Sequence, residues 1–409
     1  MIREAIYEQL SHTRRAQLHR LIGEAIEAMV ADAPDERASA LAHHFSSAGD
    51  TAKAYEYHSR AATAAERVYA IEPALAHSTA ALEAGGELGL EVDRDPAIRA
   101  LLLQRGRMRY RTGDHASAKS DFEAALDGAR RSGDRVIEME TLNALGILQL
   151  RTDLSAAAAF HEAALVIAQE LEDEAAQTNA LDRLSVISSH LLELDRGLEL
   201  GERSLELARG TGDLSAVGRA MDSIKLAALQ LGDLLRLEEL TTELERIWRG
   251  RSDLWYLQWT LLESAFVPIG AAHWDEAAQR LADAVAINRR VRDPLAEALI
   301  LDALCWLHRS RGAYEQALSA GRRAVALGAS IGWEGWTAPT LGCVLLELGA
   351  PGPAAAVLER GLATAEENGA RQALTRCLSQ LAWARWLLGA RDEARSLADR
   401  ADKLLEQVS

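Results

Sequence analysis

The segment SGDRVIEMETLNALGILQL, residues 132–150, decides the fold of this chain. Asp134 can cap the N-terminus of a helix, and Leu142, Leu145 and Leu148 follow at helical spacing. An aspartate recurs between two helical patterns at gaps of 39, 40, 40 and 40 residues: Asp134, Asp173, Asp213, Asp253 and Asp293. A fixed period of this length is typical of proteins built from stacked repeats. The sequence therefore predicts a repeat protein with a helix beginning at each of these aspartates.

Each repeat contains two helices. The pattern that begins at Asp134 stops near Thr152-Asp153, and a second one, LSAAAAFHEAALVIAQE, occupies residues 154–170. Similar turns recur about every 40 residues, from Gly113-Asp114 to Gly389-Ala390. Two helices joined by a short turn form an αα-hairpin, so the sequence predicts a stack of such hairpins.

Small residues recur at matching places in these hairpins. Second helices carry them at a spacing of four and then three residues, as in Ala156-Phe160-Ala163, and first helices carry apolar–small pairs such as Leu145-Gly146. This pattern resembles the tetratricopeptide repeat in a longer, 40-residue form. The resemblance implies an all-α, right-handed α–α superhelix, a solenoid of about nine to ten helical hairpins. We expect irregular repeats over residues 35–112 and regular ones over residues 113–409.

Charge and composition limit the kinds of partner. The 409 residues include 45 basic and 61 acidic ones, which gives a formal net charge of −16 and disfavours direct nucleic-acid binding. No apolar stretch is long enough to span a membrane, and the N-terminus lacks the apolar segment of a signal peptide. Three cysteines without a CxxC pair suit a reducing compartment. We therefore expect a cytoplasmic protein without membrane contact.

The N-terminal part carries a second resemblance. The run Ile2-Arg3-Glu4-Ala5-Ile6-Tyr7, followed by Arg14-Arg15 and later by Leu41-Ala42-His43-His44-Phe45, looks like a segment of large bacterial signalling ATPases of the STAND type. These include LuxR-type transcriptional regulators that resemble the maltose-regulon activator. In that family the segment closes a winged-helix part and leads into a repeat arm. The resemblance implies that residues 1–34 are a helical lead-in of this kind.

Two departures from that family are visible. The chain has no GxxxxGK[ST] phosphate loop, so it cannot hold a nucleotide by that mechanism, and it ends at Ser409 without a basic helix-turn-helix. We therefore expect a fragment of a larger regulator or a stand-alone relative. The resemblance implies ATPase and output domains on the same chain or on a partner chain.

Motifs typical of metal-dependent catalysis are missing from the sequence. It contains no HExxH and no Cys/His cluster with zinc spacing. His43-His44 is the only adjacent histidine pair, and it fits helix packing better than a metal site. We predict a non-catalytic protein with no cofactor, no catalytic residues and no metal ligands.

Polar residues recur at one position of the first helices. When the repeats are aligned with one another, this position holds Asn143, Asp182, Asp222, Glu263 and Asp302. Asp and Asn are unfavourable in the middle of a helix, so their recurrence needs a reason. Either the side chains bond to backbone or to a neighbouring repeat, or they form a ladder along the concave groove. Such a ladder would suit a peptide backbone or a cationic ligand.

Tryptophan is confined to the C-terminal part, where all nine residues lie between Trp248 and Trp386. By the same alignment, Trp306 and Trp383 follow the small site of their helix and should face the groove, and Trp386 lies one turn further. Trp combines a large apolar area with a polar N–H, which suits contact with a ligand. The alternative is that these residues belong to the core between helices.

We predict a ligand-sensing or protein-binding arm of a bacterial signal-transduction or transcription regulator. A peptide, a partner protein or a small effector would bind in the concave groove and shift the population of arm conformations or the self-association of the arm. The alternative is a free-standing adaptor that scaffolds protein–protein interactions. The ligand-binding candidates are Asn143, Asp182, Asp222, Glu263, Asp302, Trp306, Trp383 and Trp386.

Overall fold

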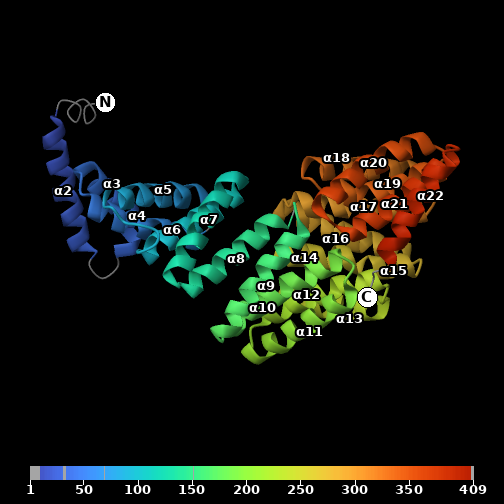
Figure 1. Cartoon of the computed structure of the whole chain (residues 1–409), viewed down its shortest axis with the longest axis horizontal. Helices are drawn as coiled ribbons and strands as arrows, with labels where there is room; N and C mark the ends of the chain where they lie inside the picture. The colour runs from blue at the N-terminus through green and yellow to red at the C-terminus, as the bar shows by residue number, and fades with distance from the viewer. Residues whose placement is uncertain (1–9, 31–33, 69, 151, 407–409) are drawn as a thin grey trace. The chain divides into compact units, whose positions relative to one another are not determined.

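The computed structural model describes residues 10–30, 34–68, 70–150 and 152–406, and every regular element in these ranges is a helix (Figure 1). The predicted all-α stack of consecutive hairpins is confirmed. The chain divides into two compact units, Met1–Leu148 and Gln149–Ser409. The expected domain boundaries after residues 34 and 112 remain predictions, and the segment 2–7 lies outside the described residues.

The first unit consists of helices, which pack on their neighbours in chain order as far as residue 132. They are α2 (His12–Met29), the 3-10 helix η1 (Pro34–Arg37), α3 (Ala38–Ala48), α4 (Thr51–Arg67), α5 (Ile71–Glu87), α6 (Pro96–Arg111), α7 (His115–Ser132) and α8 (Arg135–Gln149), whose last residue begins the second unit.

The second unit contains two layers of helices. Its helices are α9 (Leu154–Glu170), α10 (Glu174–His190), α11 (Leu194–Thr211), α12 (Leu214–Leu231), α13 (Leu234–Arg251), α14 (Leu254–Ser264), α15 (Phe266–Gly270), α16 (Trp274–Val291), α17 (Pro294–Ser310), α18 (Tyr314–Ser330), α19 (Glu334–Glu347), α20 (Pro351–Asn368), α21 (Arg371–Leu387) and α22 (Arg391–Leu405). Beyond the contacts between consecutive helices, α10 packs on α12, α14 on α17, α17 on α19, and α19 on α21. We call α10, α12, α14, α17, α19 and α21 the inner layer.

The periodic aspartates cap helices, as predicted. Asp173 accepts a hydrogen bond from the backbone N–H of Ala176 at 2.9 Å, and Asp293 accepts one from Leu295 at 2.9 Å. Asp134, Asp213 and Asp253 make equivalent bonds. The residue before each of the five has a positive φ, which lets the chain turn from one helix into the next: Gly133, Glu172, Gly212, Ser252 and Arg292.

Small residues in the hairpins mark close approaches between helices. A Cβ atom added to Gly342 of α19 would lie 2.8 Å from Leu358 of α20, and one added to Gly321 of α18 would lie 2.8 Å from the sulfur of Cys305. Carbon atoms in contact prefer about 3.5–4.0 Å, so neither position has room for a larger side chain. The spacing of small residues therefore reflects the packing of neighbouring helices.

One inner helix is interrupted, which the sequence analysis did not predict. The helix that begins after Asp253 ends at Ser264, and the short α15 follows. Pro268 lies in α15, and a proline ring clashes with the carbonyl group four residues earlier, which here belongs to Ser264. The interruption places Phe266 at the junction of the two helices.

The two ends of the inner layer meet. Gln230 of α12 donates a hydrogen bond to Gln372 of α21 at 3.0 Å, and α10 contacts α21. An apolar cluster joins the two regions: Leu154, Ala157 and Ile187 from α9 and α10 with Trp336, Ala365, Ala370 and Ala373. The second unit therefore curls until its early and late repeats touch.

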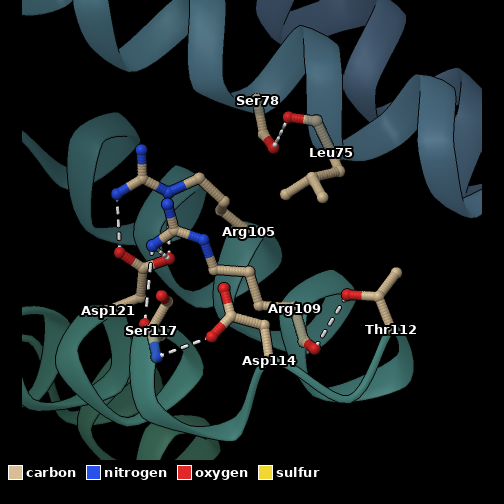
Figure 2. A network of polar contacts seen from close by, with 8 residues as sticks. All are labelled: Leu75, Ser78, Arg105, Arg109, Thr112, Asp114, Ser117 and Asp121. Atoms are coloured by element: carbon tan, nitrogen blue, oxygen red, sulfur yellow. Dashed lines mark hydrogen bonds and ion pairs between the residues drawn. The ribbon is translucent and has the colours of Figure 1, made fainter.

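A buried ion-pair network joins α6 to α7 in the first unit (Figure 2). Arg105 bonds to Asp121 through two nitrogen atoms, at 2.6 and 2.9 Å, and Arg109 bonds to the same carboxylate at 2.7 Å. Asp114 caps the start of α7 through the N–H of Ser117. The side chain of Asp121 is only 4% exposed, so this carboxylate binds two arginines in a largely dry environment.

Histidines also pair between helices of the first unit. The Nδ1 atoms of His19 and His44 are 2.9 Å apart, as are those of His58 and His77. His43 stacks obliquely on His44, with ring centroids 5.4 Å apart. The pair His43-His44 thus takes part in packing between α2 and α3.

We predict that Asp121→Ala destabilises the protein by about 3 kcal/mol, because it leaves two arginines without their buried counter-charge. Thermal and urea unfolding would measure the change. Glu123→Ala, which removes an exposed carboxylate from the same helix, is the matched control and should change stability by less than about 0.5 kcal/mol. Equal effects of the two substitutions would contradict the prediction.

Candidate functional site

A pocket of about 310 Å³ lies within the second unit, lined by its inner layer. Its lining comprises Asn179, Asp182, Arg183, Val186 and His190 of α10; Arg219, Asp222, Ser223, Leu226 and Leu229 of α12; Trp255, Tyr256, Trp259, Leu262 and Glu263 of α14; Phe266 of α15; Leu295, Leu299 and Asp302 of α17; Trp333 and Trp336 at the start of α19; and Gln372 and Arg376 of α21. Apolar walls with a few convergent polar groups are typical of ligand sites.

The structure brings four of the five predicted ladder residues together in this pocket. Asp182, Asp222, Glu263 and Asp302 all line it, each from a different inner helix. Asn143 does not, because it lies on α8 in the first unit. The recurring polar position therefore supplies four carboxylates to one pocket, from α10, α12, α14 and α17 in turn, and we call them the row of carboxylates.

Lys225 of α12 neutralises the middle of that row. Its ammonium group lies 2.6 Å from Asp222 and 2.5 Å from Glu263, and the residue is fully buried. Burial alone lowers the pKa of Lys225, but the two carboxylates outweigh burial, so its pKa lies above the ordinary value. Lys225 is not among the residues predicted from the sequence. The lysine holds α12 against α14.

Asp182, at one end of the row, keeps an unused oxygen. The hydroxyl of Ser204 donates to its Oδ1 at 2.5 Å, while its Oδ2 lies 3.9 Å from Nε of Arg219. Both of these last atoms are buried, and neither has a hydrogen-bond partner among the described residues. Burial raises the pKa of Asp182 to about 7. The site thus offers an unsatisfied acceptor beside an unsatisfied donor.

Asp302, at the other end, takes part in a chain of bonds across three inner helices. The hydroxyl of Thr340 on α19 donates to Oδ2 of Asp302 at 2.9 Å and accepts from Arg376 of α21 at 3.1 Å. Oδ1 of Asp302 has no hydrogen-bond partner in the described part of the chain. Burial raises the pKa of Asp302 to about 6. A buried carboxylate oxygen without a donor costs stability unless a ligand supplies one.

Aromatic side chains form the apolar walls. Trp333 and Trp336 stack on each other with ring centroids 5.4 Å apart, and the edge of His190 faces Trp336 at 4.8 Å. Burial lowers the pKa of His190 to about 4, so this ring is neutral at physiological pH. Trp255 and Trp259 line the pocket from α14, and Nε1 of Trp259 is buried without a hydrogen-bond partner among the described residues.

The three tryptophans selected from the sequence lie elsewhere. Trp306, Trp383 and Trp386 do not line the pocket, and their side chains are 39%, 47% and 56% exposed. Trp306 packs beside Phe266, and Arg391 covers the ring of Trp386. Trp306 comes four residues after Asp302, about 6 Å further along the helix axis. Their role in binding remains a prediction.

The described residues contain no group of three or more His, Cys, Asp or Glu side chains that could hold a metal ion. Cys305 and Cys377 are buried, and burial raises the pKa of each thiol to about 12, so both are protonated at physiological pH. Within the same part of the chain, none of the helices combines the length and the apolar character needed to cross a bilayer.

Comparison with known proteins agrees with this architecture. Residues 97–170 match the family model described as tetratricopeptide repeat. The fold is a tetratricopeptide-type solenoid. A search of curated proteins found no match.

Solved structures with the same fold share little sequence with the chain. A Rap protein complexed with competence and sporulation factor is 13% identical, with a TM-score of 0.65 over 87% of this chain and 98% of that one. Aspartyl phosphate phosphatase F from Bacillus subtilis is 10% identical, with a TM-score of 0.52 over 85% and 92%. A STAND protein with a tetratricopeptide repeat sensor, from Pyrococcus horikoshii, is 13% identical, with a TM-score of 0.51 over 87% and 53%.

We predict that Lys225→Met destabilises the second unit by about 3 kcal/mol or more, because two buried carboxylates lose their shared cation. The triple variant Lys225→Met, Asp222→Asn, Glu263→Gln should recover most of the loss, since it leaves no buried charge at the position. Urea unfolding compares the variants, with the exposed Lys119→Met as control. A triple variant as unstable as the single one would show that packing, not charge, dominates.

We also predict that Asp302→Asn is more stable than the wild type, and that the difference in stability grows as the pH rises. The folded-state pKa of Asp302, about 6, lies above its ordinary value of 3.8, so folding favours the protonated form. The stability from this group is complete at low pH and is lost as the pH rises through about 4 to 6. Melting temperatures should therefore favour the variant more at about pH 8 than at about pH 5. A variant that is less stable at both pH values would indicate a structural role for the carboxylate.

Proposed function

We propose that this chain is a recognition arm of a signal-transduction or transcription regulator. In this proposal the pocket of the second unit binds a peptide, a segment of a partner protein or a small effector. The observation that carries the proposal is the convergence of four carboxylates, three arginines and six Trp, Tyr and Phe side chains on one pocket. These groups come from α10 to α21, so the repeats jointly build the site.

The size of the pocket favours a small occupant. Ligand pockets usually measure about 300–1,000 Å³, and this one, at about 310 Å³, is at the lower end. It suits a short part of a peptide or a small effector better than the surface of a folded domain. This supports ligand sensing over the adaptor alternative, which would use an extended open groove.

Unsatisfied polar atoms support binding as well. Asp182, Arg219, Trp259 and Asp302 each line the pocket and each have a buried atom without a hydrogen-bond partner in the described part of the chain. Buried polar atoms are bonded in most proteins, and in this proposal a ligand or ordered water completes the bonding of these four.

The similar structures agree with this reading at the level of analogy. The Rap protein was crystallised with competence and sporulation factor, and the protein from Pyrococcus horikoshii has a tetratricopeptide repeat sensor. We propose that ATPase and output domains, on the same chain or on a partner, respond to this arm. The charge of −16 argues against direct binding of nucleic acid by the arm itself.

The contact between the two ends of the inner layer suggests how binding is transmitted. Gln372 and Arg376 of α21 line the pocket together with α10 and α12, and Gln372 also bonds to Gln230. A ligand that contacts both ends would change the balance between closed and more open forms of the unit. That balance, or self-association that depends on it, would be the signal that a linked domain reads.

We predict that filling the pocket abolishes binding. Leu226, a half-buried residue of α12, lines the pocket, and Leu226→Trp would occupy part of its volume. A peptide library displayed on phage should yield binders to the wild type that lose at least about tenfold in affinity for this variant. Calorimetric titration with the selected peptides would measure the loss.

The matched control is Leu235→Trp, the same exchange at a residue of α13 that is 77% exposed and outside the pocket. It should leave the affinity unchanged. Melting temperatures would show that both variants are folded. Selected peptides that bind Leu226→Trp as tightly as the wild type would place the recognition surface elsewhere and contradict the proposal.

A further inference from the structure

The carboxylates of the row differ in their bonding. The two central ones pair with a cation of the protein, whereas Asp182 and Asp302 each keep one oxygen atom without a hydrogen-bond partner among the described residues. Asp222 and Glu263 are both committed to Lys225, so the chain itself supplies the cation for this part of the row. Asp302 has no ion pair among the described residues, and its buried Oδ1 atom lacks a donor. A ligand that brings a cation would therefore gain more at Asp302 than at the middle of the row.

Arg376 lies beside Asp302 and also makes few hydrogen bonds within the protein. Arg376 and Asp302 bond to the same hydroxyl of Thr340, at 3.1 and 2.9 Å, from helices on either side of α19. Within the described residues Arg376 makes no other hydrogen bond or ion pair. The remaining N–H groups of its half-buried guanidinium are free to bind a carboxylate in the fork geometry that Arg favours.

An apolar wall adjoins this charged pair. Trp336 precedes Thr340 by four residues on α19, so both lie on the same face of that helix, one turn apart. Trp336 is largely buried in the fold, stacks on Trp333 and lines the pocket. A ligand held by Asp302 and Arg376 would therefore present its next group to an indole surface.

We propose that Asp302, Thr340 and Arg376 form a head-group subsite for a zwitterion of the amino-acid class. The ammonium of the ligand binds Oδ1 of Asp302, its carboxylate binds Arg376, and its apolar or aromatic side chain packs against Trp333 and Trp336. The inference rests on the proposed function, because it assigns a ligand class to the same pocket. A free amino acid and a very short peptide share this chemistry.

The pocket carries groups of both charges. Its acidic residues share the lining with Arg183, Arg219 and Arg376, and the ammonium of Lys225 binds two of the carboxylates. A purely cationic or purely anionic ligand would leave one of the two charged groups at Thr340 unpaired in a partly dry site. A zwitterion satisfies both at once.

The test uses four probes titrated calorimetrically into the full chain. L-phenylalanine carries both charges, phenethylamine lacks the carboxylate, 3-phenylpropionate lacks the ammonium, and glycyl-L-phenylalanine separates the two charges by one peptide bond. We expect L-phenylalanine or the dipeptide to bind at least about tenfold more tightly than either singly charged probe. The tighter of the two zwitterions identifies whether a free amino acid or a short peptide is the better fit.

Two variants test which residue binds the ammonium of the ligand and which binds its carboxylate. Asp302→Asn should weaken the zwitterion by at least about tenfold and leave 3-phenylpropionate unchanged, whereas Arg376→Gln should weaken the zwitterion and leave phenethylamine unchanged. The controls remove one charge each from exposed sites, with Glu297→Gln on the same helix as Asp302 and Arg395→Gln on α22. Asp302→Asn alone decides the matter if Arg376→Gln does not fold.

Several outcomes would overturn the inference. A singly charged probe that binds as tightly as the zwitterions, or an Asp302→Asn variant that weakens all probes alike, would rule out the head-group subsite. If none of the four probes binds while library peptides still bind and lose affinity with Leu226→Trp, the zwitterion subsite is wrong and the proposed function stands. If library peptides also fail to depend on Leu226, both proposals are wrong.

Discussion

A single αα-hairpin of this chain cannot bury its own apolar face, and the whole structure follows from that constraint. Each hairpin gains its core only by packing on the hairpins before and after it. Close packing is possible because small residues such as Gly321 and Gly342 lie where helices approach most closely. The aspartate caps and the positive-φ residues before them then set where each helix begins. Together these local features fix the spacing of the repeats and, with it, the alignment of the inner helices.

That alignment turns one sequence position into a wall of the pocket. Carboxylates that are 40 residues apart in sequence, such as Asp182 and Asp222, become neighbours because equivalent positions of inner helices face the same way. Four carboxylates in one pocket would repel one another, and Lys225 offsets part of that repulsion by pairing with Asp222 and Glu263. The carboxylate oxygens without a hydrogen-bond partner in the described part of the chain then include one each from Asp182 and Asp302, the two ends of the row. Sites that are kept for binding are commonly less stable than a pocket of apolar residues would be.

Features that depend on residues near in sequence could be predicted from the sequence. Features that depend on how the repeats curl and pack on one another could not. Caps, hairpins and the polar ladder are local or periodic, so their positions could be predicted, and four of the five ladder residues line one pocket. The level of the pocket along the helix axes is set by tertiary packing, which explains why Trp333 and Trp336 line it and Trp306 does not. Lys225 could have been recognised as unusual, since lysine occurs at only four positions in the chain. Its partner Glu263 belongs to another helix and could not be inferred from spacing.

The contact between the early and late repeats of the second unit also bears on how this unit folds. Most contacts in a repeat stack join residues close in sequence, so folding can begin in any repeat and spread to the next. The hydrogen bond from Gln230 to Gln372 instead joins residues 142 positions apart. Such a contact forms only after the intervening hairpins are in place, and its loop-closure entropy makes it a late event. The pocket would therefore be completed in the last step of folding, and a chain stalled earlier would have ordered hairpins but no binding site.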